Sequence, residues 1–250
     1  MKLITQLVTI FCIFTLAGCV ITDHLIPNRY RITKREAVGT GTSSYTHSEV
    51  NRLAKETFAP AVAVEPYYYE FTSFDPSNRL LEAVQHFADP TRDLAHEVLR
   101  GADGKITRIR KYCVGGPTCT SGIWYFTYPG ANTVDVKFWD NGSIFRSTDS
   151  YTFNGAGQVT QIKRYNSADV LLTTTTNSTF DDKRNIFSYY PEGFLTVPSS
   201  NNNVIDFQVL THATSTVTNG TYSYEYNPDG WVTKRTRAGA SDDILEYEVY

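Results

Sequence analysis

Two histidines, His86 and His96, are the residues best placed for metal chemistry in this sequence. If residues 80–87 and 94–100 form a hairpin whose opposed residue numbers sum to 182, the two imidazoles face each other across neighbouring strands. Four carboxylates lie close by in the chain: Glu82, Asp89, Asp93 and Glu97. Opposed imidazoles hold a metal when a third ligand joins them. The alternative is two exposed histidines beside acids on a solvated sheet face, and the sequence predicts no metal site.

Aromatic side chains form a second group with binding chemistry. Consecutive aromatic residues occur at 67–69, at 124–126 and at 189–190. Because successive side chains of a strand point to opposite faces, such runs place rings on both faces. The candidate ligand platform consists of Tyr68, Trp124, Tyr125 and Tyr190. An exposed platform stacks on sugar rings or binds a protein, whereas rings buried inside a closed or double-layered sheet serve packing.

Catalytic motifs do not stand out in the sequence. It contains neither a Gly-x-Ser-x-Gly elbow nor His-Glu-x-x-His, and no glycine-rich loop has phosphate-binding spacing. We therefore predict a chain that is not an enzyme, with no catalytic residue and no cofactor. The formal net charge of −3 argues against a nucleic-acid partner, which requires a basic patch.

The amino terminus carries a secretory signal. Met1-Lys2 is followed by a mostly apolar run from Leu3 to Ala17, which ends at Leu16-Ala17-Gly18-Cys19. This ending resembles the lipobox of bacterial lipoproteins, in which the cysteine is acylated after residues 1–18 are removed. The resemblance implies a palmitate-type lipid on Cys19 and a membrane as partner. Val20, in place of Asp, favours the outer membrane. The alternative is an ordinary signal peptide that contains Cys19.

Two cysteines remain after the signal segment and Cys19. Cys113 and Cys119 flank a Val-Gly-Gly-Pro-Thr loop that can reverse the chain. Because the cell envelope permits disulfides, we predict a bridge between them. A metal pair or a redox dithiol is the alternative, but the spacing does not match Cys-x-x-Cys.

Residues 19–64 are expected to form a lipidated tether and entry segment. Within it, residues 48–58 have a weak helical pattern in Val50, Leu53, Ala54 and Phe58. From residue 65 to residue 250 the apolar period is two, which predicts strands. For the hairpin of residues 80–100, the same register pairs Val84 with Val98.

Similar turns recur between these predicted strands. They begin at Phe74, Arg100, Phe138, Phe153, Phe180 and Tyr226, and their fifth residues are Asn78, Gly104, Gly142, Gly157, Arg184 and Gly230. Glycine supplies the positive φ of a tight hairpin turn, and Asn is the next most tolerant residue. We predict an all-β antiparallel meander of about fourteen strands, curled or partly closed like a barrel.

The sequence pattern of these turns, aromatic-x-aromatic-Asp/Asn-x-x-Gly-x-apolar, resembles the YD repeats of RHS-type shell proteins. Residues 180–187, 199–207 and 222–235 are similar to uncharacterised lipoproteins of Bacteroidota, and the likeness extends loosely over residues 65–250. That family is described as porin-like and all-β, with unknown function. The resemblance implies the fold and an envelope location, and it transfers no catalytic residue.

Together these features predict a lipid-anchored envelope protein that acts as a binding or structural β-scaffold, with a glycan or an envelope protein as candidate partner. Two alternatives remain. One is a surface carbohydrate-binding lipoprotein that uses exposed aromatic residues, and the other is an envelope hydrolase with a polar cleft.

Overall fold

The computed structural model describes residues 30–48, 53–61, 65–114, 116, 121–185, 188, 197–240 and 242–249. Residues 32–247 form one compact unit. Residues 1–31 and 248–250 form a second, of which only the outer ends of two strands are described. Among the described residues, no helix has the length and apolar content needed to cross a membrane.

In the described part of the chain, sixteen strands build the sheet. They are β1 Tyr30–Ala37, β2 Gly41–His47, β3 Leu53–Pro60, β4 Tyr67–Phe74, β5 Leu80–Phe87, β6 Leu94–Arg100, β7 Ile106–Cys113, β8 Gly122–Gly130, β9 Thr133–Asp140, β10 Ile144–Phe153, β11 Val159–Asn166, β12 Leu171–Arg184, β13 Asn202–Thr211, β14 Thr216–Tyr226, β15 Val232–Arg237 and β16 Asp243–Val249. A 3₁₀ turn, Pro90–Arg92, connects β5 to β6.

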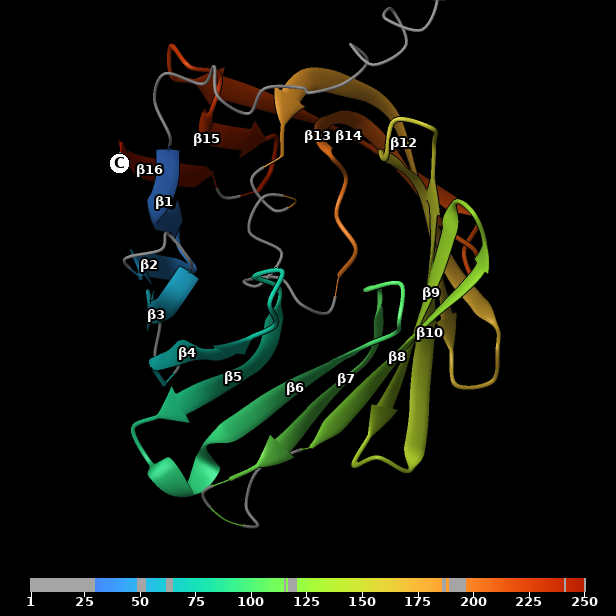
Figure 1. The fold of residues 1–250 in the computed structure, drawn as a ribbon. Coiled ribbons are helices and arrows are strands. Elements are labelled where there is room, and N and C mark those ends of the chain that lie inside the picture. The colour runs from blue at the N-terminus through green and yellow to red at the C-terminus, as the bar shows by residue number, and fades with distance from the viewer. Residues whose placement is uncertain are drawn as a thin grey trace, which may run out of the picture. The chain divides into compact units, whose positions relative to one another are not determined.

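Each strand lies beside its neighbour in the chain, and β1 lies beside β16, so the sheet closes into a barrel (Figure 1). Closure gives each described strand a neighbour on both sides, and a sheet closed in this way presents no edge strand. The predicted all-β antiparallel meander is confirmed, with sixteen strands rather than about fourteen.

The barrel interior contains the apolar core. Its buried members come from most of the strands: Ile32, Tyr45, Leu53, Phe71, Leu80, Ala83, Val98, Ile109, Phe126, Val136, Tyr151, Val159, Val232 and Leu245. Leu80 and Ile109 are completely buried. Burying one such side chain contributes about 1.5–3 kcal/mol. The period-two pattern of the sequence therefore fills the barrel with packed side chains.

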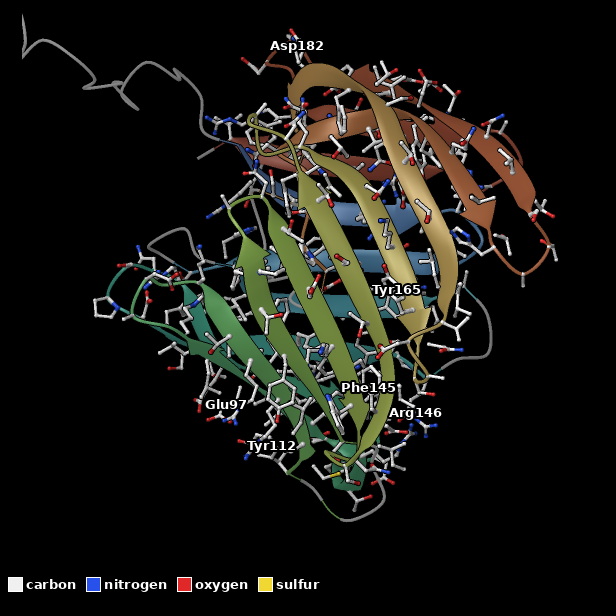
Figure 2. All side chains as sticks on the ribbon, turned by 90° about the vertical axis from the view of Figure 1, so that its right-hand side faces the viewer. Glu97, Tyr112, Phe145, Arg146, Tyr165 and Asp182 are labelled. Carbon is white, nitrogen blue, oxygen red and sulfur yellow. The ribbon has the colours of Figure 1, made fainter. Side chains whose placement is uncertain are left out.

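The outer face of the barrel is polar and charged. Because side chains alternate along a strand, the neighbours of core residues point outward. Ion pairs join adjacent strands on this face, as between Arg110 and Glu97 at 3.4 Å and between Lys34 and Glu246 at 2.9 Å. Figure 2 looks onto this face, where the labelled Glu97 projects away from the sheet.

The predicted turn positions are confirmed in five of six cases. Positive φ values of 61°, 80°, 69°, 73° and 82° occur at Asn78, Gly104, Gly142, Gly157 and Gly230. The prediction is wrong at Arg184, because β12 continues through this residue. Side chains also help to close these turns. Asn154 Oδ1 accepts hydrogen bonds from the backbone N–H groups of Ala156 and Gln158, each at 3.0 Å.

The predicted entry segment proves to contain three strands, β1 to β3, so the sheet begins at residue 30 rather than 65. The helical pattern in residues 48–58 is also wrong from Leu53 onward, because β3 pairs with β2 and β4. Glu56 lies opposite Tyr45 on one side and Tyr69 on the other. Pairing on both sides outweighs a weak local helical preference.

The predicted register of the β5–β6 hairpin is wrong. Glu82 lies opposite Glu97 and Ala83 lies opposite His96, so opposed numbers sum to 179 rather than 182. The connection fixes this register. Asp93 Oδ1 accepts a hydrogen bond from the Phe87 backbone N–H at 2.9 Å. An odd shift of register turns every side chain of one strand to the other face.

Candidate functional site

The two histidines of the metal hypothesis lie on opposite faces of the sheet. His86 is on the outer face, where its Nδ1 hydrogen-bonds Asp93 Oδ2 at 2.7 Å and its ring stacks on Tyr68. His96 points inward and is buried. Burial, together with the charge of Lys111, lowers the pKa of His96 to about 4. The pair cannot share a metal, and within the described ranges no cluster of His, Cys, Asp and Glu has metal-binding geometry.

The four residues of the aromatic platform do not form one surface. Tyr68 faces outward beneath Lys55 Nζ, which lies 3.7 Å from its ring centre. Trp124 faces inward and stacks on Phe138 with ring centres 4.8 Å apart, so its place in the platform is wrong. Tyr125, the next residue, is exposed on the outer face. Tyr190 lies outside the described residues.

The cysteine predictions are largely untested. Cys113 ends β7 and is disulfide-bonded. Cys119 lies outside the described residues, so its pairing with Cys113 stays a prediction. Cys19 and residues 1–18 also lie outside them, and lipidation likewise stays a prediction.

The most site-like feature of the described barrel is a cavity of about 320 Å³ against the strands β11 to β16 and β1. Its walls are mixed in character. The apolar side chains are Ile162, Val204, Phe207, Val209, Val232 and Leu245, and the polar ones are Arg35, Thr175, Asn177, Asn185, Asn203, Tyr222, Tyr224, Arg235 and Asp243. Mostly apolar walls with a few placed polar groups are typical of small-molecule sites.

A partly buried Arg35–Asp243–Arg235 cluster forms the charged side of this cavity. Arg35 Nε and Nη2 donate to Asp243 Oδ1 at 3.1 and 2.9 Å. Arg235 Nε donates to the other oxygen, Oδ2, at 2.9 Å, and its Nη2 donates to the same atom. Strand pairing brings these three side chains together. Arg235 of β15 lies directly opposite Asp243 of β16, and β1, which carries Arg35, flanks β16 on its other side.

The cluster is suited to binding rather than to proton transfer. Guanidinium groups stay protonated in proteins, so Arg35 and Arg235 act as fixed donors and positive charges. Both oxygens of Asp243, the one carboxylate among the described residues that line the cavity, accept hydrogen bonds from them. The cluster therefore holds two guanidinium groups and one carboxylate in fixed positions in the cavity wall.

Aromatic rings form the wall beside this cluster. Phe207 and Tyr222 stack with ring centres 5.2 Å apart. The guanidinium carbons of Arg235 and Arg237 lie 5.1 Å from the ring centres of Tyr222 and Phe207, respectively. Gly220 lies directly opposite Phe207, and a Cβ there would come within 2.2 Å of the ring. A glycine is thus what allows the Phe207 ring to lie flat over β14.

Several polar groups of the lining are already bonded within the protein. Asn177 Nδ2 donates to the Val159 carbonyl at 2.7 Å. Asn203 Nδ2 donates to Asp181 at 2.8 Å, and the Tyr224 hydroxyl donates to the Val204 carbonyl at 2.7 Å. These hydrogen bonds hold the side chains of the wall in place. They also give these polar groups partners within the protein, so a ligand does not have to supply them.

A second buried polar group lies next to the cavity, on β2 and β3. Ser43 Oγ donates to Glu56 Oε1 at 2.8 Å, and the Tyr45 hydroxyl donates to the same oxygen at 3.3 Å. Burial raises the pKa of Glu56 above its ordinary value, against the lowering effects of these two donors and of Arg35. Glu56 is thus held by its own donors and does not line the cavity.

Sequence reasoning missed the charged side of the cavity entirely. Arg35 and Asp243 come from segments with no motif, and the likeness of residues 222–235 to lipoproteins gives Arg235 no ligand role. The alternating tyrosines of β14 are a signal that could have found it, because side chains two residues apart in a strand share a face. Tyr222 and Tyr224 both line the cavity.

Comparison with known proteins relates the chain to solved structures through its fold. No protein-family model matches the sequence, and no curated protein matches it. A porin-like protein from Bacteroides vulgatus matches with a TM-score of 0.56 and 11% identity, over 87% of this chain and 98% of that one. A porin-like protein from Bacteroides uniformis matches with a TM-score of 0.52 and 12% identity, over 88% and 96%. The chain is thus similar in fold to porin-like β-barrel proteins of Bacteroides.

Proposed function

We propose that this chain is a lipid-anchored binding protein of the bacterial cell envelope, and not an enzyme. Its barrel lies in water, tethered through Cys19 to the outer membrane, and holds a small molecule in the cavity. The observation that carries the proposal is the cavity of about 320 Å³ with the Arg35–Asp243–Arg235 cluster in its wall. A barrel with only a structural role requires neither a cavity nor a charged cluster in the cavity wall.

The charged outer face supports a barrel that lies in water. A barrel that spans a membrane needs an outward apolar band about 25 Å tall. Here outward positions carry residues such as Lys55, Glu70, Arg110 and Lys137, which lie near the middle of their strands. Lipid contact would bury these charges at a cost of about 2–4 kcal/mol for each midplane Lys or Arg. The envelope location is supported by the porin-like neighbours and by the lipobox resemblance.

Molecules that co-purify with the chain test this function. The full-length protein is isolated from membranes of its host and denatured, and the released small molecules are identified by mass spectrometry. A matched pair of variants locates the site: Val209→Phe fills the cavity, and Leu210→Phe changes the next residue of β13 without lining the cavity. We expect a molecule that is retained by the wild type and by Leu210→Phe and lost from Val209→Phe. Equal recovery from all three proteins, or none from any, contradicts the proposal.

A further inference from the structure

We propose that Lys111 and His96, on the inner face of β7 and β6, form a site that binds a small aromatic aldehyde covalently as an imine. This site is separate from the cavity of the proposed function, because neither residue lines that cavity. The inference depends on three observations: an inward amine without an acidic partner, a buried imidazole nitrogen without a hydrogen-bond partner, and stacked aromatic rings beside them.

Strand pairing places Lys111 beside His96 on the inner face. Lys111 of β7 lies directly opposite His96 of β6. Ile109 and Val98, two residues away along the same strands, are buried in the core, so Lys111 and His96 also point inward. Lys111 is partly exposed and lies two residues before the end of β7, which gives a ligand access to its amine.

The Lys111 amine is held without a counter-charge. Within the described part of the chain, no carboxylate forms an ion pair with it, and burial lowers its pKa below the ordinary value. Asp140, two strands away in the same row of residues, accepts a hydrogen bond from Arg146 at 2.7 Å instead. Burial favours the neutral amine, which is the form of lysine that attacks a carbonyl carbon.

His96 provides a proton-transfer group next to this amine. It is 7% exposed, and its Nε2 atom has no hydrogen-bond partner among the described residues. Because its pKa is about 4, the imidazole is neutral near pH 7 and both accepts and donates. Oε1 of Gln85, on the next strand, is a second buried acceptor that the described residues leave unbonded. Buried polar atoms normally have partners, so this inner surface favours a ligand with a polar reactive end.

Aromatic rings beside Lys111 favour a flat apolar body on that ligand. Gly122 lies directly opposite Lys111 on the other side, in β8. Trp124 and Phe138 stack with ring centres 4.8 Å apart. A Cβ at Gly122 would come within 2.9 Å of the Phe138 ring and 3.3 Å of the Trp124 ring, so both rings lie over this glycine. Aromatic ligands pack well against such rings, face to face with an offset or edge to face.

The covalent step is a condensation. The neutral Lys111 nitrogen adds its lone pair to the aldehyde carbon, and the π electrons of the C=O bond move to oxygen. Both amine hydrogens transfer to that oxygen, one of them through Nε2 of His96. The oxygen leaves as water, and a C=N bond joins the aldehyde to Lys111. The step needs neither an oxidant nor a reductant, and addition of water reverses it.

Reductive trapping measures the reactivity of each lysine. The full chain in detergent solution is incubated at neutral pH with benzaldehyde and sodium cyanoborohydride, which reduces an imine to a stable benzylamine. Mass spectrometry of peptides then gives a rate for each position. We expect Lys111 to react at least about tenfold faster than Lys137, an exposed outward lysine of β9, because a desolvated lysine is activated. The two rates should become equal in guanidinium chloride. Equal rates in the folded protein overturn the inference.

Two variants separate covalent chemistry from burial. Lys111→Arg keeps the charge and removes the nucleophile, so the fast adduct should disappear, whereas the matched control Lys137→Arg should retain it. His96→Leu keeps the site apolar and removes Nε2, so the rate at Lys111 should fall at least about tenfold, as loss of a positioned proton-transfer group implies. A fast adduct in Lys111→Arg, or an unchanged rate in His96→Leu, contradicts the assigned site.

The cavity and the imine site are tested independently. Val209→Phe, which fills the cavity, should leave the rate at Lys111 unchanged. A rate that falls in this variant contradicts a separate site, whatever molecule co-purifies with the chain. Because the comparison of Lys111 with Lys137 uses wild-type protein, it decides the inference even where a variant fails to fold.

Discussion

Asp243 accepts hydrogen bonds from two arginines in the cavity wall, Arg35 and Arg235. It lies 7% exposed between Arg35 and Arg235 and joins strands β1, β15 and β16 through side-chain hydrogen bonds. Removing one partner of a buried ion pair leaves an uncompensated charge, which destabilises far more than loss of a surface pair. The same residue thus affects both stability and the charge of the cavity.

Asp243→Asn should lower the free energy of unfolding by about 2–3 kcal/mol, less than the ~3–5 of a fully buried pair because both arginines are partly exposed. Glu246→Gln, at an exposed pair with Lys34, should change the free energy of unfolding far less than Asp243→Asn does. Urea titration followed by circular dichroism measures both. Equal effects would mean that the cluster is not stabilising.

His96 gives the barrel a pH-dependent stability. Burial lowers its pKa to about 4 in the folded state, against an ordinary value of 6.5. The unfolded chain therefore binds the proton first, so stability falls as pH drops from about 6.5 to about 4, by roughly 3 kcal/mol. His96→Leu should remove that part of the pH dependence. Urea midpoints at several pH values test this, and an unchanged slope in His96→Leu contradicts it.

At the scale of elements, the hairpin turns set strand pairing. The β10–β11 turn joins two strands through Asn154, which hydrogen-bonds across it, and through Gly157 at a φ of 73°. A Cβ at Gly157 would also come within 2.2 Å of Asn201 Nδ2. Gly155, in the same turn, has open space around it. One glycine is required by geometry and the other is not.

Gly157→Ala should therefore lower the free energy of unfolding by about 1–2 kcal/mol, the cost of a side chain in the left-handed region. Gly155→Ala is the matched control and should change stability by less than ~0.5 kcal/mol in either direction. Thermal unfolding of the two variants provides the comparison. A larger loss in Gly155→Ala than in Gly157→Ala would contradict the role given to this turn.

At the scale of the whole molecule, an apolar core lies inside the barrel, and ion pairs such as Lys34–Glu246 and Arg110–Glu97 lie on its outer face. Under the proposed function, the chain is attached to the membrane through a lipid. Attachment to the envelope is therefore expected to depend on a single residue, Cys19, outside the barrel.

Cys19→Ala should abolish palmitate labelling of cells that express the chain. The variant should also move from the detergent phase to the aqueous phase on detergent phase separation, because outward positions of the described strands carry charged residues such as Arg110 and Lys137. Labelling that persists in the variant argues against lipidation at Cys19. Loss of labelling without a change of phase argues for direct contact between the barrel and lipid.

The sequence determined by itself that the chain is a meander of antiparallel strands joined by tight turns. Local chemistry is sufficient for that conclusion: period-two alternation specifies strands, and Asn78 or Gly157 specifies a turn with positive φ. Where the local signal was weak, as in the segment around Leu53 and Phe58, pairing with neighbouring strands decided the outcome.

Only the tertiary structure decided which side chains meet. The register of β5 against β6 separated His86 from His96, and closure of β1 on β16 brought Arg35 to Asp243. Both results depend on contacts between strands, and a one-residue change of register reverses the faces. The sequence specifies that side chains alternate along a strand. Which face points inward, and which residues of neighbouring strands lie opposite each other, is decided only when the sheet closes.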